Sequence, residues 1–124
     1  MLQDKVVLVV DDDLTLSEMY VERVKAEGAT VLVARDGEEA LAQVRDNHPH
    51  AIILDIMMPK MNGLDVLRAL YEDSSTKNIP VVILTALDDQ EKRRVAAEYG
   101  AADYIVKSES LPVDVIEKLK TILI

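Results

Sequence analysis

Cysteine is absent from this chain of 124 residues, which excludes a disulfide framework and any site built on a thiolate. Long hydrophobic runs are absent as well, since no apolar stretch approaches the length needed to span a membrane. Gln3, Asp4 and Lys5 interrupt the beginning of the chain, so the sequence predicts no signal peptide. We therefore expect a cytoplasmic protein that makes no contact with a membrane.

Basic residues are fewer than acidic residues in this chain. The chain has 14 lysines and arginines against 23 aspartates and glutamates, a net charge of −9. Its one run of basic residues is Lys92-Arg93-Arg94, which is most simply interpreted as a solvated helix face. Because a nucleic-acid surface needs a basic patch, we do not expect this chain to bind nucleic acid directly.

Apolar runs alternate with helical patterns along the whole chain, without linkers or repeats, which predicts a single domain over residues 1–124. The runs lie at residues 6–10, 30–34, 51–54, 81–84 and 104–106. Runs of this kind are typical of strands buried on both faces. Strands that alternate with helices predict an α/β fold, with a doubly wound parallel sheet between helices. Periodicity alone leaves the order of the strands open.

Polar residues follow four of these runs directly. Asp11 and Asp12 come after the first run, Asp55 after the third, Thr85 after the fourth and Lys107 after the fifth. Ionisable groups placed just beyond buried strands are costly unless they have a use. In open parallel sheets, ligands bind at the carboxyl ends of the strands. The sequence therefore predicts an acidic pocket at that edge.

The residue types in this pocket suit phosphoryl transfer. Three crowded carboxylates raise one another's pKa unless a cation intervenes, and Mg²⁺ is such a cation. A lysine and a threonine can serve the oxygens of a phosphoryl group, and an aspartate can be its nucleophile. Asp55 stands alone after its strand, whereas Asp11 and Asp12 are adjacent. We therefore predict that Asp55 is the nucleophile and that the pair holds the metal.

Several motifs together resemble the receiver domain of bacterial response regulators. They are Val9-Val10-Asp11-Asp12, Leu54-Asp55-Ile56-Met57-Met58-Pro59, Asn62-Gly63, Leu84-Thr85-Ala86, and residues 100–107, Gly-Ala-Ala-Asp-Tyr-Ile-Val-Lys. The resemblance covers essentially the whole chain, in order and with the expected spacing. It implies a flavodoxin-like (βα)5 fold of five parallel strands in the order 2-1-3-4-5.

The resemblance also implies roles for the acidic residues. Asp55 would accept a phosphoryl group from a histidine kinase or a histidine phosphotransfer protein. Asp12, Asp55 and the backbone carbonyl of Met57 would ligate Mg²⁺, and Asp11 would assist through water. The protein would be a regulatory domain in a two-component phosphorelay. It would catalyse its own phosphorylation and slow dephosphorylation and would not be an enzyme that acts on other substrates.

The remaining implied roles concern the response. Thr85 and Lys107 would hold the phosphoryl oxygens, and Thr85 and Tyr104 would couple phosphorylation to the face formed by the fourth helix, fifth strand and fifth helix. Tyr104 would turn from solvent towards the sheet. That face would bind a downstream protein target or form a phosphorylation-dependent homodimer. Ser108 departs from the family, which commonly has proline there, so the path of the chain after Lys107 stays open.

Two residues beside the implied attack path of water are apolar. By resemblance, Met57 and Leu87 flank the approach of the water that hydrolyses the aspartyl phosphate. Neither side chain can orient that water through a hydrogen bond, and both can crowd its path. We therefore predict a comparatively long-lived phosphorylated state.

Alternatives from other classes remain at this point. Asp11-Asp12-Asp13-Leu14-Thr15 also fits the D-x-D-x-T signature of haloacid-dehalogenase-like phosphatases, with Asp11 as nucleophile and Asp13 as acid. That interpretation leaves Asp55 unexplained and lacks a later acidic pair. A pseudo-receiver that binds partners without phosphorylation is a second alternative. A flavin-binding flavodoxin fits less well, because no Ser/Thr/Gly phosphate loop follows the first apolar run.

Overall fold

Five parallel strands form one sheet in the computed structural model, which describes residues 2–123. The strands are β1 (Val6–Val10), β2 (Thr30–Ala34), β3 (Ala51–Leu54), β4 (Val81–Thr85) and β5 (Asp103–Val106). Their order is β2-β1-β3-β4-β5, and every neighbouring pair is parallel. Each apolar run of the sequence is thus a strand, and the strand order implied by the family resemblance is confirmed.

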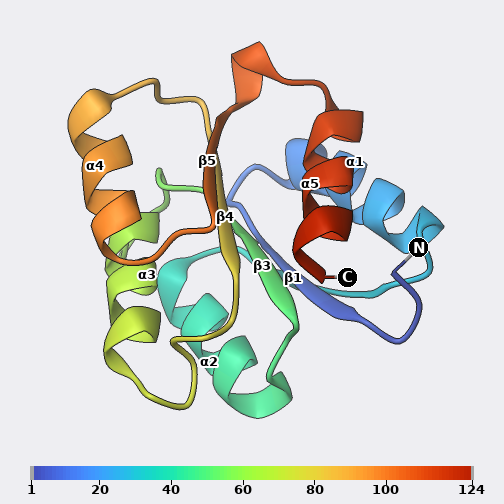
Figure 1. Ribbon diagram of the computed structural model, residues 1–124, viewed down its shortest axis with the longest axis horizontal. Helices are drawn as coiled ribbons and strands as arrows, with labels where there is room; N and C mark the ends of the chain where they lie inside the picture. The colour runs from blue at the N-terminus through green and yellow to red at the C-terminus, as the bar shows by residue number, and fades with distance from the viewer. Residues whose placement is uncertain (1, 124) are drawn as a thin grey trace.

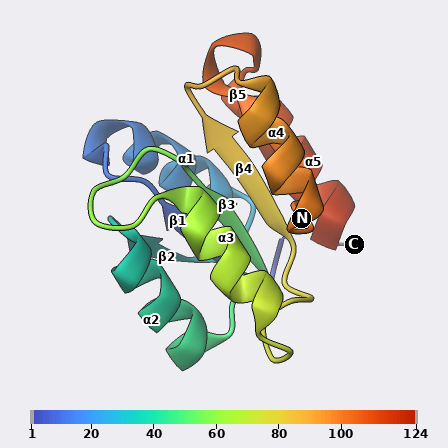
Figure 2. The same cartoon turned by 90° about the vertical axis from the view of Figure 1, so that its left-hand side faces the viewer.

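Helices cover both faces of the sheet. They are α1 (Leu14–Ala26), α2 (Gly37–Asn47), α3 (Gly63–Glu72), α4 (Gln90–Glu98) and α5 (Pro112–Leu123). Helices α2, α3 and α4 lie on one face, while α1 and α5 lie on the other (Figure 1). Figure 2 looks onto the face that carries α2, α3 and α4. None of the helices in the described part of the chain is both long and apolar enough to cross a membrane.

Alternate residues of the strands feed two separate cores, because successive side chains of a strand point to opposite faces. Leu8 and Val10 of β1 belong to the core beneath α2 and α3, whereas Val7 and Val9 belong to the core beneath α1 and α5. A strand that is buried on both sides must be apolar throughout, which is why β1 reads as an unbroken hydrophobic run. Polar side chains are therefore confined to the ends of the strands.

Side-chain caps fix where four of the helices begin. Asp13, Asp36, Asn62 and Asp89 each accept a hydrogen bond from the backbone N–H three residues later, at 2.9–3.1 Å. Such a cap satisfies one of the N–H groups that a helix start leaves without a partner. For α4 the capping residue is Asp89.

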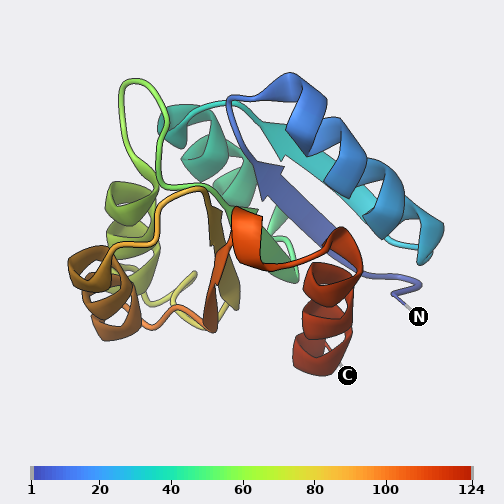
Figure 3. The ribbon, with the colours of Figure 1, turned by 90° about the horizontal axis from the view of Figure 1, so that it is seen from above.

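The segment after β5 is a single 3-10 turn, Lys107–Glu109, which leads to Pro112 at the start of α5. No peptide bond in the described residues is cis, so the chain passes from Lys107 to Ser108 through a trans bond. Figure 3, viewed from above, looks onto the carboxyl edge of the sheet, where this turn and the loops before α1, α3 and α4 surround one region.

Candidate functional site

Four neighbouring strands deliver polar residues to the same place. Asp11 follows β1, Asp55 follows β3, Thr85 ends β4 and Lys107 follows β5. A pocket of about 810 Å³ opens at this edge, and its lining includes Asp11, Asp12, Asp55 and Lys107. The acidic pocket predicted at the carboxyl edge is present, with Asp11, Asp12, Asp55 and Lys107 in its lining, whereas Thr85 is fully buried and is not one of the lining residues.

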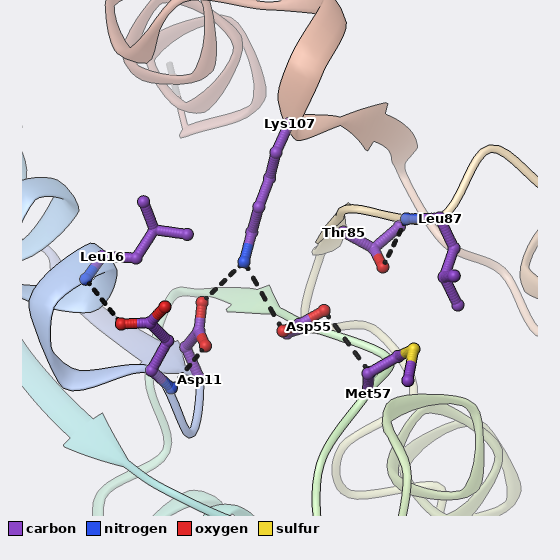
Figure 4. A network of polar contacts seen from close by, with 8 residues as sticks. Asp11, Leu16, Asp55, Met57, Thr85, Leu87 and Lys107 are labelled. Carbon is purple, nitrogen blue, oxygen red and sulfur yellow. Dashed lines mark hydrogen bonds and ion pairs between the residues drawn. The ribbon is translucent and has the colours of Figure 1, made fainter.

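Lys107 connects the two buried carboxylates. Its Nζ lies 3.0 Å from Asp11 Oδ2 and 3.5 Å from Asp55 Oδ2, as Figure 4 shows. The side chains of Lys107, Asp11 and Asp55 are only 16%, 6% and 9% exposed. A buried charge is costly without a partner, so the lysine and the two aspartates stabilise one another in this position.

Burial shifts the proton affinity of both partners. The pKa of Asp55 is raised, mainly because burial disfavours its ionised form, and Asp11 adds to the shift while Lys107 opposes it. For Lys107, burial works to lower the pKa, but attraction to Asp11 and Asp55 outweighs it and leaves the pKa raised. Asp55 is therefore a carboxylate whose negative charge is incompletely compensated by the chain.

Three carboxylates converge closely enough for a cation. One oxygen each of Asp11, Asp12 and Asp55 lies within 4.8 Å of the other two. Asp11 and Asp55 are buried, whereas Asp12 is exposed at the rim. Hard carboxylate oxygens with access to water are the donors that Mg²⁺ takes, so these residues fit that ion. The backbone N–H of Met57 donates to Asp55 Oδ1 at 3.4 Å, which keeps the start of the β3–α3 loop beside this cluster.

Thr85 and Tyr104 meet at the β4–α4 loop. Thr85 is fully buried, and its hydroxyl oxygen accepts a hydrogen bond from the backbone N–H of Leu87 at 3.3 Å. The Tyr104 hydroxyl donates to the backbone carbonyl of the same Leu87 at 2.7 Å. Both predicted switch residues are thus bonded to one peptide segment.

Tyr104 occupies a position on the sheet side. Tyr104 is 8% exposed, and burial raises the pKa of its phenol. The sequence predicted a tyrosine that alternates between solvent and the sheet. Of these two positions, the structure contains the one against the sheet.

The interpretation of residues 92–94 as a solvated face is incomplete, because two of the three residues, although partly exposed, also lie beside functional residues. Lys92 lines the pocket, and the guanidinium of Arg93 lies over the ring of Tyr104. Only Arg94 conforms, because it pairs with Glu91 and Glu98 along the exposed side of α4. Consecutive residues of a helix point in different directions, and that rule was the available signal.

Gly63 determines the shape of the site but contributes no reacting group. A Cβ at this position would lie 2.1 Å from the backbone oxygen of Asp55, a distance that no real side chain tolerates. The absence of a side chain lets the Gly63 N–H reach the carbonyl of Ile56 at 2.8 Å. The close return of α3 to the end of β3 therefore depends on glycine, a requirement that the Asn62-Gly63 motif does not reveal by itself.

Residues 7–120 match the family described as the response regulator receiver domain. The chain belongs to this family. It is 45% identical over 101 residues to the DNA-binding response regulator MtrA of Mycobacterium tuberculosis, a match that covers 82% of this chain and 43% of that protein. The chain spans about half the length of the curated relatives it matches.

Solved receiver structures have the same fold. The receiver domain of the Francisella response regulator 1452 is 31% identical, with a TM-score of 0.87 and 97% of each chain covered. The chemotaxis protein CheY4 of Vibrio cholerae is 31% identical, with a TM-score of 0.88, and the match covers 96% of this chain and 98% of that one. Both likenesses extend over nearly the whole chain.

The phosphatase alternative is not favoured by this family membership. The structure agrees, because Asp13, its supposed acid, uses its carboxylate to cap α1 by accepting from the backbone N–H of Leu16 at 3.1 Å. Asp11, its supposed nucleophile, is bonded to Lys107 and accepts from the backbone N–H of Asp13 at 2.9 Å. As a receiver domain the chain is a signalling regulator of two-component systems.

Proposed function

We propose that Asp55 is the phosphoacceptor of this receiver domain and that its donor is a histidine kinase or a histidine phosphotransfer protein. The observation that carries the proposal is the placement of Lys107 against a buried Asp55 carboxylate at the edge of the sheet. A buried carboxylate with incompletely compensated charge is a reactive nucleophile, and the neighbouring ammonium group can take the charge of an incoming phosphoryl group.

In the transfer step, a carboxylate oxygen of Asp55 bonds to phosphorus and the phosphorus–nitrogen bond to the donor histidine breaks. The electron pair of that bond stays on the imidazole, which then takes up a proton. Lys107 already reaches Asp55, and it would pair with the phosphoryl oxygens. The Thr85 hydroxyl only accepts in its bond to Leu87, so its proton is available for a further phosphoryl oxygen.

Asp12, Asp55 and the backbone carbonyl of Met57 would hold Mg²⁺ in this proposal, with Asp11 contributing through water. When bound, the ion supplies positive charge that offsets the charge of the carboxylates and the phosphoryl group. Asp12 suits this role because it is the exposed member of the cluster, whereas Asp11 is engaged with Lys107.

The response would pass through the β4–α4 loop. Thr85 and Tyr104 both bond to Leu87, so a shift of Thr85 towards a phosphoryl group is transmitted to the α4-β5-α5 face. We infer that this face binds a downstream protein target or a second phosphorylated copy of the chain. The net charge of −9 argues against direct binding of nucleic acid by these residues, although MtrA is described as DNA-binding.

Intact-mass spectrometry after incubation with acetyl phosphate and Mg²⁺ tests the proposal. We expect one added phosphoryl group on the wild type and none on Asp55→Asn. The matched control is Asp13→Asn, which keeps a helix-capping residue in the same pocket and should be labelled normally. Undiminished labelling of Asp55→Asn, or loss of labelling only in Asp11→Asn, would reject Asp55 and revive the phosphatase alternative.

A further inference from the structure

Arg93 makes three contacts around the switch tyrosine. Its guanidinium carbon lies 4.6 Å from the centre of the Tyr104 ring, and its Nη1 donates to the backbone oxygen of Tyr104 at 3.4 Å. Its Nη2 lies 3.6 Å from Asp88 Oδ1, in the β4–α4 loop. The side chain thus joins β5, the first turn of α4 and the loop that precedes it.

This arrangement fixes the tyrosine at both ends. The cation covers one face of the ring, and the hydroxyl at the far end donates to the carbonyl of Leu87. A guanidinium suits the task because it can stack on an aromatic ring while its N–H groups bond in the plane. Lys92 and Arg94 point elsewhere, towards the pocket and towards Glu91 and Glu98, so only Arg93 of the basic run takes part.

We propose that Arg93 is a positioning residue that holds Tyr104 against the sheet whether or not Asp55 is phosphorylated. The unphosphorylated domain would then already populate the arrangement of the α4-β5-α5 face that phosphorylation favours. This inference rests on the proposed function, since it takes the position of Tyr104 to determine the arrangement of the α4-β5-α5 face.

The contacts themselves support independence from Asp55. Arg93, Asp88 and the Leu87 carbonyl supply every bond named above, and neither Arg93 nor Asp88 is among the residues that line the pocket around Asp55. Phosphorylation acts on Tyr104 only through Thr85 and the Leu87 segment. Where a resting equilibrium already favours one position, a ligand that favours the same position shifts the population little. Arg93 would therefore set the resting activity of the domain.

Fluorine NMR of protein labelled with 3-fluorotyrosine tests the proposal, with the Tyr104 signal assigned by its loss in Tyr104→Phe. In the wild type we expect that signal at a buried position, with little change when Mg²⁺ and beryllofluoride are added. In Arg93→Met we expect the signal to move towards the position of an exposed tyrosine and to return when Mg²⁺ and beryllofluoride are added. Arg93→Lys, which retains a cation, should lie between the two.

Arg94→Met is the matched control, because it removes an arginine from the next position of α4 without contact to Tyr104. Its Tyr104 signal should match the wild type. If Arg93→Met also matches the wild type before beryllofluoride is added, the proposal is wrong. If Arg93→Met does not fold, a Tyr104 signal of Arg93→Lys identical to the wild type has the same meaning.

Failure of the proposed function has a different signature. A wild type that Mg²⁺ and acetyl phosphate do not label at Asp55 would reject phosphorylation. The comparison of Arg93→Met with Arg94→Met in the absence of a phosphoryl mimic would still decide whether Arg93 holds the tyrosine.

Discussion

The two loops that border the pocket are held in opposite ways. The β3–α3 loop is fixed through its backbone: the Gly63 N–H bonds to the carbonyl of Ile56, the Met61 N–H bonds to the carbonyl of Pro59, and a Cβ at Gly63 would collide with the backbone of Asp55. The β4–α4 loop is held by side chains, namely the hydroxyls of Thr85 and Tyr104 on Leu87, and Arg93 on Asp88.

The difference separates chemistry from signalling. Asp55 must meet the phosphoryl donor in one geometry, and backbone contacts have no alternative arrangement to offer. Side-chain hydrogen bonds and a cation–π contact can be exchanged for others of similar free energy, so removing one of them shifts the balance between two positions. We therefore expect substitutions in the first loop to damage the fold or the reaction, and substitutions around the second to change populations.

The largest effect should come from Gly63→Ala, which breaks the rigid loop. Gly63 has no left-handed backbone angle, so the whole cost is the collision with Asp55, and we expect a loss of about 3 kcal/mol in the free energy of unfolding. Urea denaturation measures it. Gly100→Ala is the control, because its left-handed φ of +77° costs about 1–2 kcal/mol while its nearest contact is 3.3 Å to the Tyr71 ring, compared with 2.1 Å to the Asp55 backbone for Gly63. A smaller loss for Gly63→Ala than for Gly100→Ala would contradict the rigid-loop account.

We predict that the lifetime of the phosphorylated state depends on one residue from each loop. Met57 belongs to the β3–α3 loop and Leu87 to the β4–α4 loop. Both side chains line the pocket, and Met57 is 58% exposed. We expect Met57→Asn combined with Leu87→Glu to speed phosphoryl loss roughly tenfold, which is about 1.4 kcal/mol of barrier. Decay of isolated phosphoprotein at matched Mg²⁺ saturation measures it. The single variants show which loop sets the rate, and unchanged decay in the double variant would reject control by these side chains.

Magnesium should stabilise the rigid side of the pocket. At ten times its Kd, a ligand that binds only the folded state adds about 1.4 kcal/mol, which raises the melting temperature by several degrees. Asp12→Asn should lose most of that increase, while Asp13→Asn, whose residue caps α1, should keep it. A wild-type melting temperature that millimolar Mg²⁺ leaves unchanged would mean that the three carboxylates do not form the ion site.

The smallest effect concerns pH. Because burial raises the pKa of Asp55, the folded state disfavours its ionised form, and this penalty is full above the folded-state pKa and absent below the unfolded one. In metal-free buffer, Asp55→Asn should therefore unfold with a higher free energy than the wild type at neutral pH. The gap should close as the pH falls through the pKa of Asp55. If the difference in free energy of unfolding between the two proteins stays constant with pH, it results from packing and not from the charge of Asp55.

Much of this site could be predicted from sequence because it lies at the ends of β1, β3, β4 and β5. The inner strands are buried on both faces and are therefore unbroken apolar runs, so Asp11 and Asp55 stand out where those runs stop. Strand order is different: hydrophobic periodicity carries no information about neighbours, and only the family resemblance supplied it.

The roles that the sequence did not predict depend on where side chains point, and how closely elements approach, in the folded protein. Helix α4 has a single buried residue, Ala96, so its sequence has no apolar stripe that could orient Lys92 and Arg93 relative to the pocket and Tyr104. The role of Gly63 depends on how closely α3 returns to Asp55, a distance that no local pattern encodes. Both missed features are contacts between successive elements, and they depend on how closely and at what angle the fold sets those elements against each other.

The most direct test of the account is the position of the acyl phosphate in the wild-type protein. Borohydride reduces an aspartyl phosphate to homoserine, and peptide mass spectrometry then locates the changed residue. After phosphorylation by acetyl phosphate and Mg²⁺, we predict homoserine at position 55 alone. Homoserine at position 11, or none anywhere in the chain, would contradict the assignment of Asp55 as the phosphoacceptor.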